Sequence, residues 1–317
     1  MSEPLKAPAL CPGDTVAIVA PASSPKREQL DPAVAAWEAA GFRVRVGRDL
    51  CDPQDFLSAD DDTRARELNA ALRDPEVRAV VAVRGGYGLV RVLDRIDYAA
   101  LAADPKVIAG YSDLSALHAA VWRRTGLVTF HSPNAIDLPA SVSRNPADGE
   151  TLLRLACGDA AEGVSTADAA HAGAVAASVN RPGVARGRLA GGNLAVIAGL
   201  VGTPWQVDLD GAIFAIEEIG EAPYRVDRYL AQFRLAGQLE RVAGVAVGHF
   251  TDCGEGDPQE LTRVLEHYLG GLGVPVLTGL PFGHAQPNQA LAFGARYLLD
   301  AGRGELRRLE PAVGGRG

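Results

Sequence analysis

The chain has 317 residues, 47% of them hydrophobic and 22% charged, which suits two domains with buried cores and excludes a globally disordered protein. Its 39 acidic residues outnumber its 31 basic residues, so the net charge is −8. Because nucleic acids and anionic membranes attract a positive surface, we expect neither as a partner.

Short β-branched segments alternate with amphipathic segments through the first half of the chain. Nearly continuous apolar strands separated by helices indicate a parallel sheet that is covered on both faces. We therefore predict an α/β domain over residues 1–157. The strands are predicted at 15–20, 43–46, 79–83, 107–110 and 127–130, and the helices at 27–40, 63–72, 89–94 and 114–124.

Residues 158–186 contain almost no large apolar side chain and predict an interdomain linker. Periodicity then returns and predicts a smaller α/β domain with a mixed sheet over residues 187–317, whose closing hairpin joins 291–293 to 297–299. A groove between the two domains is the expected place for a site. Strands are predicted at 212–216, 242–247 and 274–277, and helices from Asn193, at 224–235 and at 258–269.

The four cysteines lie far apart in the sequence and form no CxxC pair. This spacing argues against a disulfide framework or a structural zinc site and favours a reducing compartment. The first 14 residues contain no apolar signal-peptide segment, and the longest apolar stretch, 194–201, is too short to span a membrane. We expect a cytoplasmic protein. The cysteines are Cys11, Cys51, Cys157 and Cys253.

A glycine-rich turn, RGGYG at residues 84–88, follows the strand predicted at 79–83. Its glycines allow a sharp turn that leaves backbone N–H groups facing an anion. The spacing differs from the Gly-x-Gly-x-x-Gly of dinucleotide sites. An oxyanion-binding turn, a purely structural turn and a nucleotide site therefore all remain open.

The next strand ends in GYSD at residues 110–113, where a helix is predicted to begin. A serine at such a turn has its hydroxyl lifted clear of the sheet, with the next backbone N–H placed for an oxyanion. Ser112 is thus a candidate nucleophile, although Ser112 or Asp113 could equally cap the helix. A nucleophilic serine also needs a base and an orienting acid.

Six histidines are candidates for the base. His284 lies in an irregular loop of turn-forming residues at 280–287, the kind of segment in which functional residues concentrate. His131 is the second choice, and His118 is interpreted as a packed helix residue. Structural roles are available to the remaining three, which are His171, His249 and His267.

The orienting acid is expected at the end of the strand over 212–216, where Glu217 and Glu218 follow an apolar run. Adjacent carboxylates on a strand point to opposite faces, so only one of them can meet a given histidine. A solvated acidic loop is the alternative. Residues 60–62, three consecutive aspartates, are interpreted as a helix cap and not as a metal site, and we expect no metal.

In their order along the chain, these segments resemble the LD-carboxypeptidase family of serine peptidases, which also contains the microcin C immunity peptidases. Each motif is weak singly, but the ordered set covers residues from about 10 to 300. The matching segments are 13–23 (GDTVAIVAPAS), 84–88, 110–113, 126–131 (GLVTFH), 191–194 (GGNL), 202–205 (GTPW), Glu217 with 223–225 (PYR), and 282–284 (FGH).

The resemblance implies that Ser112 is the nucleophile, His284 the general base and Glu217 the acid that orients it. The backbone N–H groups of Gly86 and Asp113 would form the oxyanion hole. The family usually has Asp after its catalytic Glu, whereas this chain has Glu218, so the sequence leaves open which carboxylate faces the histidine. The family also implies a flavodoxin-like N-terminal domain, no cofactor, and a homodimer.

The activity implied by the resemblance is hydrolysis of an amide bond between an L-configured centre and a terminal D-residue. The expected reaction releases D-Ala from a murein tetrapeptide in cell-wall recycling. A peptidase for a peptidyl-nucleotide or aminoacyl-nucleotide is the alternative within the family. A non-catalytic module that binds a nucleotide or phosphate at the glycine turn is the alternative from another class.

Overall fold

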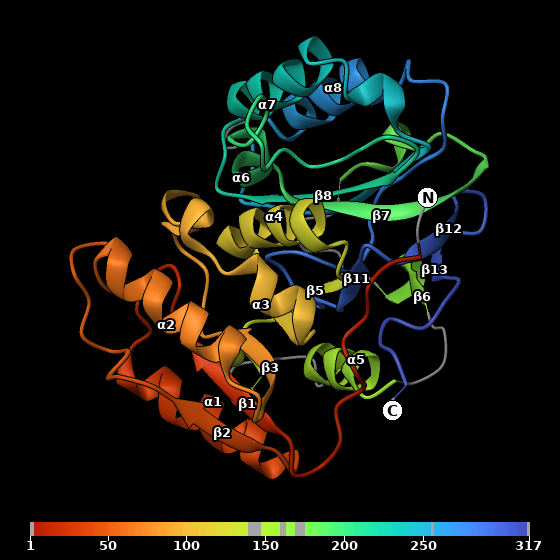
Figure 1. The fold of residues 1–317 in the computed structure, drawn as a ribbon. Helices are drawn as coiled ribbons and strands as arrows, with labels where there is room; N and C mark the ends of the chain where they lie inside the picture. Colours follow the sequence, from red (N-terminus) through yellow and green to blue (C-terminus); the bar gives the residue numbers. More distant parts are fainter. Residues whose placement is uncertain (1–2, 139–146, 159–162, 169–174, 255–256, 316–317) are drawn as a thin grey trace. The chain divides into compact units, whose positions relative to one another are not determined.

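The computed structural model describes residues 3–138, 147–158, 163–168, 175–254 and 257–315, and it divides into two compact units (Figure 1). Unit 1 comprises Met1–Ala160, Ala290–Ala292 and Pro311–Gly317, and unit 2 comprises Ala161–Gln289 and Phe293–Glu310. Parts of the predicted linker, 159–162 and 169–174, lie outside the described residues. None of the helices in the described ranges combines the length and apolar character needed to cross a membrane.

Unit 1 contains a six-stranded sheet in the order β11-β5-β4-β3-β1-β2. The pairs β2–β1, β1–β3, β3–β4 and β4–β5 are all parallel, and this 2-1-3-4-5 order is that of flavodoxin-like folds. The prediction of a flavodoxin-like parallel sheet is confirmed. The strands are β1 (Thr15–Val19), β2 (Arg43–Val46), β3 (Val77–Ala82), β4 (Val107–Gly110), β5 (Thr129–His131) and β11 (Leu291–Phe293).

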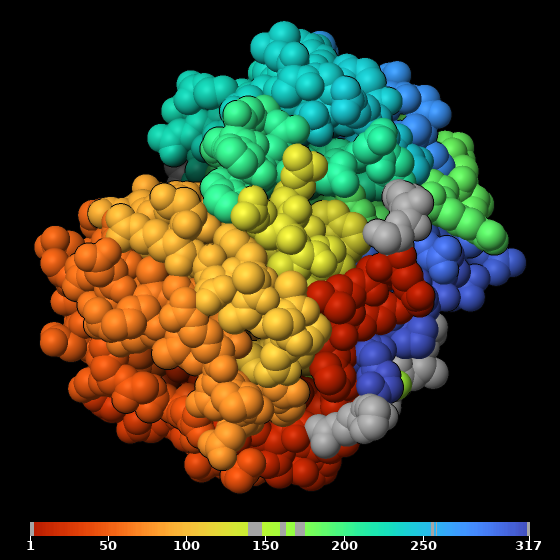
Figure 2. Space-filling view, viewed as in Figure 1, coloured from red at the N-terminus to blue at the C-terminus, as the bar shows by residue number. Residues whose placement is uncertain are grey.

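Helices pack on this sheet: α2 contacts β1 and β3, α4 contacts β5, and α1 contacts β2. Figure 2 shows the orange side chains of the segment that includes α2 on the face of unit 1 turned toward the viewer. Asp60 caps α2, because its Oδ1 accepts the Thr63 N–H at 2.8 Å, as the sequence predicted. The helices are α1 (Arg27–Ala39), α2 (Asp61–Arg73), α3 (Tyr98–Ala103), α4 (Ser115–Thr125) and α5 (Ala147–Ala156).

The helix predicted at 89–94 is wrong in type. The segment forms two short 3-10 turns, η1 (Leu89–Arg91) and η2 (Leu93–Arg95), followed by α3. Asp97 caps α3 by accepting the Ala100 N–H at 2.9 Å, so the chain must leave helical geometry before it.

Unit 2 contains a seven-stranded sheet in the order β10-β9-β8-β7-β12-β13-β6. The pairs β7–β8, β8–β9 and β9–β10 are parallel, and the pairs β7–β12, β12–β13 and β13–β6 are antiparallel. This arrangement confirms the predicted mixed sheet. Helices α7 and α8 lie side by side over it (Figure 1). The elements are β6 (Gly163–Ser165), β7 (Val184–Asn193), β8 (Ile213–Ile219), β9 (Gly244–Thr251), β10 (Val276–Leu277), β12 (Arg296–Asp300), β13 (Glu305–Arg308), α6 (Leu194–Ala198), α7 (Pro223–Leu235) and α8 (Pro258–Leu269).

The predicted closing hairpin is also wrong. Strand β11 joins the sheet of unit 1, whereas β12 pairs with β13 and β7 in unit 2. Residues 301–304 supply the tight turn of the real hairpin, with Gly304 at a φ of 70°. The sequence predicts no strand after this turn. It therefore pairs 291–293 with 297–299, although these two strands belong to different sheets.

We expect Gly191→Ala to lower the free energy of unfolding by about 3 kcal/mol or more. Gly191 has a φ of +150°, and a Cβ there would overlap the carbonyl oxygen of Ala215 on the adjacent strand. Gly202→Ala is the matched control, because Gly202 also has a positive φ, +84°, but nothing lies near its missing Cβ. Urea unfolding should show a small loss for the control, and equal losses for the two variants would contradict the steric argument.

Candidate active site

Ser112 lies at a strained turn between β4 and α4 in unit 1. Its φ is 65°, a left-handed conformation that is unfavourable for a residue with a side chain. The 3-10 turn η3 (Ser112–Leu114) begins at this serine, and α4 follows directly. The N-cap residue of α4 is Leu114, so neither Ser112 nor Asp113 caps this helix through its side chain. The strain therefore has no helix-capping explanation, and such outliers concentrate at functional positions.

The glycine turn at 84–88 contacts Ser112. A Cβ on Gly85 would lie 2.6 Å from Ser112 Cβ and 3.5 Å from the backbone nitrogen of Asp113. Gly86 has a φ of +117°, and a Cβ there would overlap the Ser23 hydroxyl. Unit 1 therefore brings Ser112, Asp113 and this turn together, at an approach that only glycines allow.

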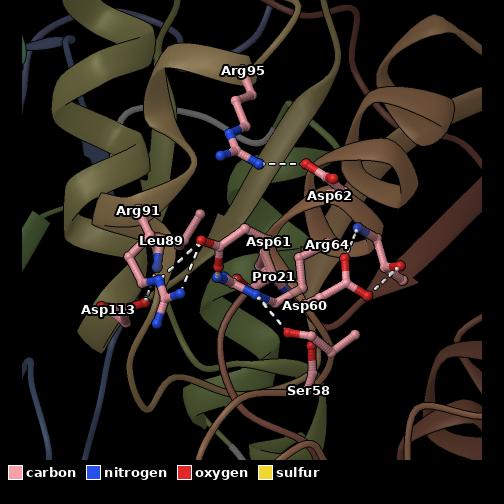
Figure 3. Close-up of polar contacts among 12 residues, drawn as sticks. Pro21, Ser58, Asp60, Asp61, Asp62, Arg64, Leu89, Arg91, Arg95 and Asp113 are labelled. Atoms are coloured by element: carbon pink, nitrogen blue, oxygen red, sulfur yellow. Dashed lines mark hydrogen bonds and ion pairs between the residues drawn. The ribbon is translucent and has the colours of Figure 1, made fainter.

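The carboxylate of Asp113 ties the glycine turn to the serine turn. Its Oδ2 accepts the Leu89 N–H at 2.9 Å, directly after residues 84–88, and the residue is only 2% exposed. On the other side, Gly88 packs over Arg64, whose Nη1 lies 2.8 Å from where a Gly88 Cβ would be. Arg64 is buried and is fixed by bonds to Pro21 O and Asp61 Oδ1, both 2.5 Å (Figure 3).

Burial raises the pKa of Asp113 from 3.8 to about 6, although the Leu89 N–H and the Arg64 charge favour the ionised form. Because the folded-state pKa is raised, the protonated carboxyl stabilises the fold fully below about pH 4, and this contribution is lost as the pH rises through about 6.

We therefore expect the free energy of unfolding of the wild type to fall, relative to Asp113→Asn, by about 2 kcal/mol between pH 4 and pH 7. The asparagine keeps an acceptor for the Leu89 N–H but does not titrate. Urea unfolding at pH 4, 5, 6 and 7 measures the difference, and parallel curves for the two proteins would refute the assignment of this titration to Asp113.

Two histidines of unit 1 are deeply buried. His118 Nε2 donates to Gly110 O at 2.9 Å, and burial lowers its pKa to about 4, so the ring is neutral at pH 7. His131, the second candidate base, is 0% exposed and its ring meets Tyr111 edge-on at 6.0 Å. Both rings pack behind the serine turn, since Gly110 pairs with His131 across β4 and β5.

In unit 2, Glu217 and His284 form a hydrogen-bonded pair. The distance from His284 Nδ1 to Glu217 Oε2 is 2.7 Å, Glu217 is 0% exposed, and the imidazole is 12% exposed. Nδ1 is therefore the donor, which places the lone pair of the neutral ring on Nε2. This pairing of a buried carboxylate with an imidazole is the arrangement by which an acid orients a general base.

The Glu218 carboxylate does not bind His284. Of the two candidates that the sequence left open, Glu217 is therefore the one that faces the histidine. Glu218 Oε1 accepts from Asn193 Nδ2 at 2.8 Å, and its Oε2 accepts from the Ala195 N–H at 2.7 Å, where α6 begins. Burial raises the pKa of Glu218 to about 7. Glu218 holds the start of α6, whereas Glu217 meets His284.

A flavodoxin-like unit with a strained serine turn, and a second unit with a buried Glu–His pair, are parts typical of a hydrolase. Residues 16–132 match the LD-carboxypeptidase N-terminal domain, and residues 186–299 match the LD-carboxypeptidase C-terminal domain. The chain belongs to the LD-carboxypeptidase family, as the sequence motifs indicated.

Curated and solved relatives cover nearly the whole chain. A probable murein peptide carboxypeptidase of Bacillus subtilis is 35% identical over 93% of this chain and 91% of its own. The microcin C7 self-immunity protein of Escherichia coli is 28% identical over 94% of each. The crystal structure of muramoyltetrapeptide carboxypeptidase from Oxalobacter formigenes has a TM-score of 0.80 and 28% identity, covering 93% of this chain and 97% of that one.

Proposed function

We propose that this protein is a serine carboxypeptidase that hydrolyses an L–D amide bond and releases terminal D-Ala from a murein tetrapeptide in cell-wall recycling. The observation that carries the proposal is the 2.7 Å bond from His284 Nδ1 to the buried Glu217 carboxylate, in a chain of the LD-carboxypeptidase family. The names of the Bacillus and Oxalobacter relatives support a murein peptide as substrate.

In this proposal residues 1–157 supply the nucleophile and residues 187–317 supply the acid and the base. As Ser112 Oγ attacks the carbonyl carbon, His284 Nε2 takes the proton of the Ser112 hydroxyl. Glu217 stabilises the imidazolium that forms. The imidazolium then protonates the amine of D-Ala as the carbon–nitrogen bond breaks. Water, deprotonated by His284, attacks the acyl-enzyme and restores the serine hydroxyl.

The oxyanion hole is assigned to the backbone N–H groups of Gly86 and Asp113. The close packing of the glycine turn on Ser112 and on the Asp113 nitrogen supports this assignment. Donors that are fixed before the reaction stabilise the developing negative charge without reorganisation, and each contributes about 3 kcal/mol in comparable sites. The chemistry needs no metal ion or organic cofactor.

An aminoacyl-nucleotide is the second candidate substrate, favoured by the 28% identity to the microcin C7 self-immunity protein. The experiment incubates the protein with a murein tetrapeptide and, separately, with an aminoacyl-nucleotide amide, and follows both by mass spectrometry. We expect loss of D-Ala from the tetrapeptide at the higher kcat/KM. Preference for the nucleotide conjugate selects the second candidate, and thermal stabilisation by a nucleotide without any turnover selects a binding module.

A cytoplasmic location and a homodimer complete the proposal. The wide spacing of the four cysteines along the sequence supports a reducing compartment. Sedimentation at micromolar concentration tests the dimer, and a monomer mass would reject it. Fractionation of cells tests the location.

A further inference from the structure

His249 is a fully buried histidine that the proposed reaction does not use. It lies on β9, which pairs in parallel with β8, the strand that carries Glu217. The register shifts between Ile216, paired with Val247, and Glu218, paired with Phe250. Glu217 therefore faces two residues of β9, Gly248 and His249, at a β-bulge, a device that re-aims side chains next to sites.

The loop that carries His284 is fixed to β9 by His249 at two points. The His249 backbone N–H donates to Phe282 O at 2.9 Å, and its Nε2 donates to Pro287 O at 2.9 Å. These carbonyls lie two residues before and three residues after His284. The histidine therefore holds both ends of the segment that places the imidazole on Glu217.

Two glycines let this segment pass close to the bulge. A Cβ on Gly248 would overlap Phe282 O, and a Cβ on Gly283, whose φ is +113°, would lie 2.8 Å from Glu217 Cβ. The Gly283 N–H donates to Asn288 Oδ1 at 3.0 Å, so the loop is also closed on itself. Such close packing fixes the position of the loop only while its ends are held.

The His249 ring donates through Nε2 to the Pro287 carbonyl and lies on the strand next to the one that carries Glu217. Burial lowers the pKa of His249, and a charge on His284 acts in the same direction, whereas the hydrogen bond to Pro287 O and the charge of Glu217 oppose this shift. Among the described residues, His249 Nδ1 and Glu217 Oε1 have no hydrogen-bond partner. Because the lowered pKa disfavours a positive charge on His249, the negative charge of Glu217 remains available to the imidazolium that forms on His284 in the proposed reaction.

We propose that His249 is a positioning residue for this reaction: by holding the carbonyls of Phe282 and Pro287, it keeps His284 Nδ1 on Glu217. The proposal rests on the proposed function for its kinetic effect. Its structural part, the bond between His284 and Glu217, is measurable without any substrate.

The test compares His249→Gln with His249→Asn. The glutamine amide is long enough to donate to Pro287 O, whereas the asparagine amide is too short, and both keep the backbone N–H that binds Phe282 O. For His249→Asn we expect a fall in kcat of about 100-fold with little change in KM, and an acidic midpoint of the kcat–pH profile displaced to lower pH. His249→Gln should retain at least a third of the wild-type kcat.

Proton NMR gives a second readout that needs no turnover. The hydrogen-bonded Nδ1 proton of His284 should give a far-downfield resonance, which Glu217→Gln identifies by abolishing it. We expect this resonance to persist in His249→Gln and to be lost in His249→Asn. His267→Asn, on the exposed face of α8, is the control for a histidine replacement without effect.

Equal kcat and equal resonances in the asparagine and glutamine variants would overturn the proposal. If neither peptide nor nucleotide is hydrolysed by the wild type, the proposed function fails, while the resonance still decides whether His249 positions His284. Should His249→Asn not fold, Asn288→Ala loosens the same loop at Gly283 and must weaken the resonance. An unchanged resonance in that variant would reject the role of the held loop.

Discussion

Ser112→Ala is expected to lower the kcat for release of D-Ala from a murein tetrapeptide by at least about 10⁴-fold. In the proposed mechanism Ser112 Oγ attacks the carbonyl carbon, so alanine would leave the general base no hydroxyl to activate. Binding and the oxyanion donors remain, so residual turnover above the uncatalysed rate is expected. Quantifying D-Ala by mass spectrometry over a long incubation measures the effect.

The fold should be unaffected, because alanine has the same Cβ as serine and tolerates the φ of 65° no worse. Thermal unfolding of Ser112→Ala should therefore match the wild type. Ser178→Ala, at an exposed serine of unit 2, is the control for loss of a hydroxyl without loss of turnover. Unchanged D-Ala release by Ser112→Ala would remove the serine-peptidase mechanism.

Glu217→Gln is expected to lower kcat by about 10³- to 10⁴-fold. The amide has the shape of the carboxylate but no charge, so it cannot stabilise the imidazolium of His284. Its NH₂ group can also face Nδ1, which favours the tautomer that places the proton on Nε2. The kcat–pH profile and burst kinetics with an activated substrate measure this loss.

Glu218→Gln is the matched control, one residue away and equally buried. Glu218 accepts from Asn193 and Ala195, so its amide variant should lose about 1–3 kcal/mol of stability. Its kcat, measured on folded protein, should stay within about threefold of the wild type, since no bond to His284 is changed. A greater kinetic loss in Glu218→Gln than in Glu217→Gln would reverse the assignment of the two carboxylates.

Much of the fold was predictable because it depends on local patterns. The central parallel strands β1, β3 and β4 are largely apolar, so their alternation with helices predicts the sheet of unit 1 directly. The strand-to-helix turn at Ser112 followed from the same periodicity. The hairpin failed because β11 and β12 are close in sequence but belong to different sheets, which no local pattern encodes.

The choice between Glu217 and Glu218 depended on contacts that lie far apart in the sequence. Strand alternation places them on opposite faces but does not identify the face that meets His284. That depends on the bulge opposite Glu217 and on Gly283 packing against its Cβ. The buried Arg64 under the glycine turn was missed for a related reason, since arginine at an amphipathic helix position ordinarily indicates a solvated face.

Strand β11 has a practical consequence for anyone who wishes to study the halves of this protein separately. Strand β11 (Leu291–Phe293), which lies beside β5, is encoded more than 100 residues downstream of the other strands of its sheet. A fragment that stops before the second domain would expose the backbone donors and acceptors of β5 to solvent, and open edges of this kind recruit other chains. Such a truncation should aggregate, whereas a version with the 291–293 strand grafted back should remain dispersed.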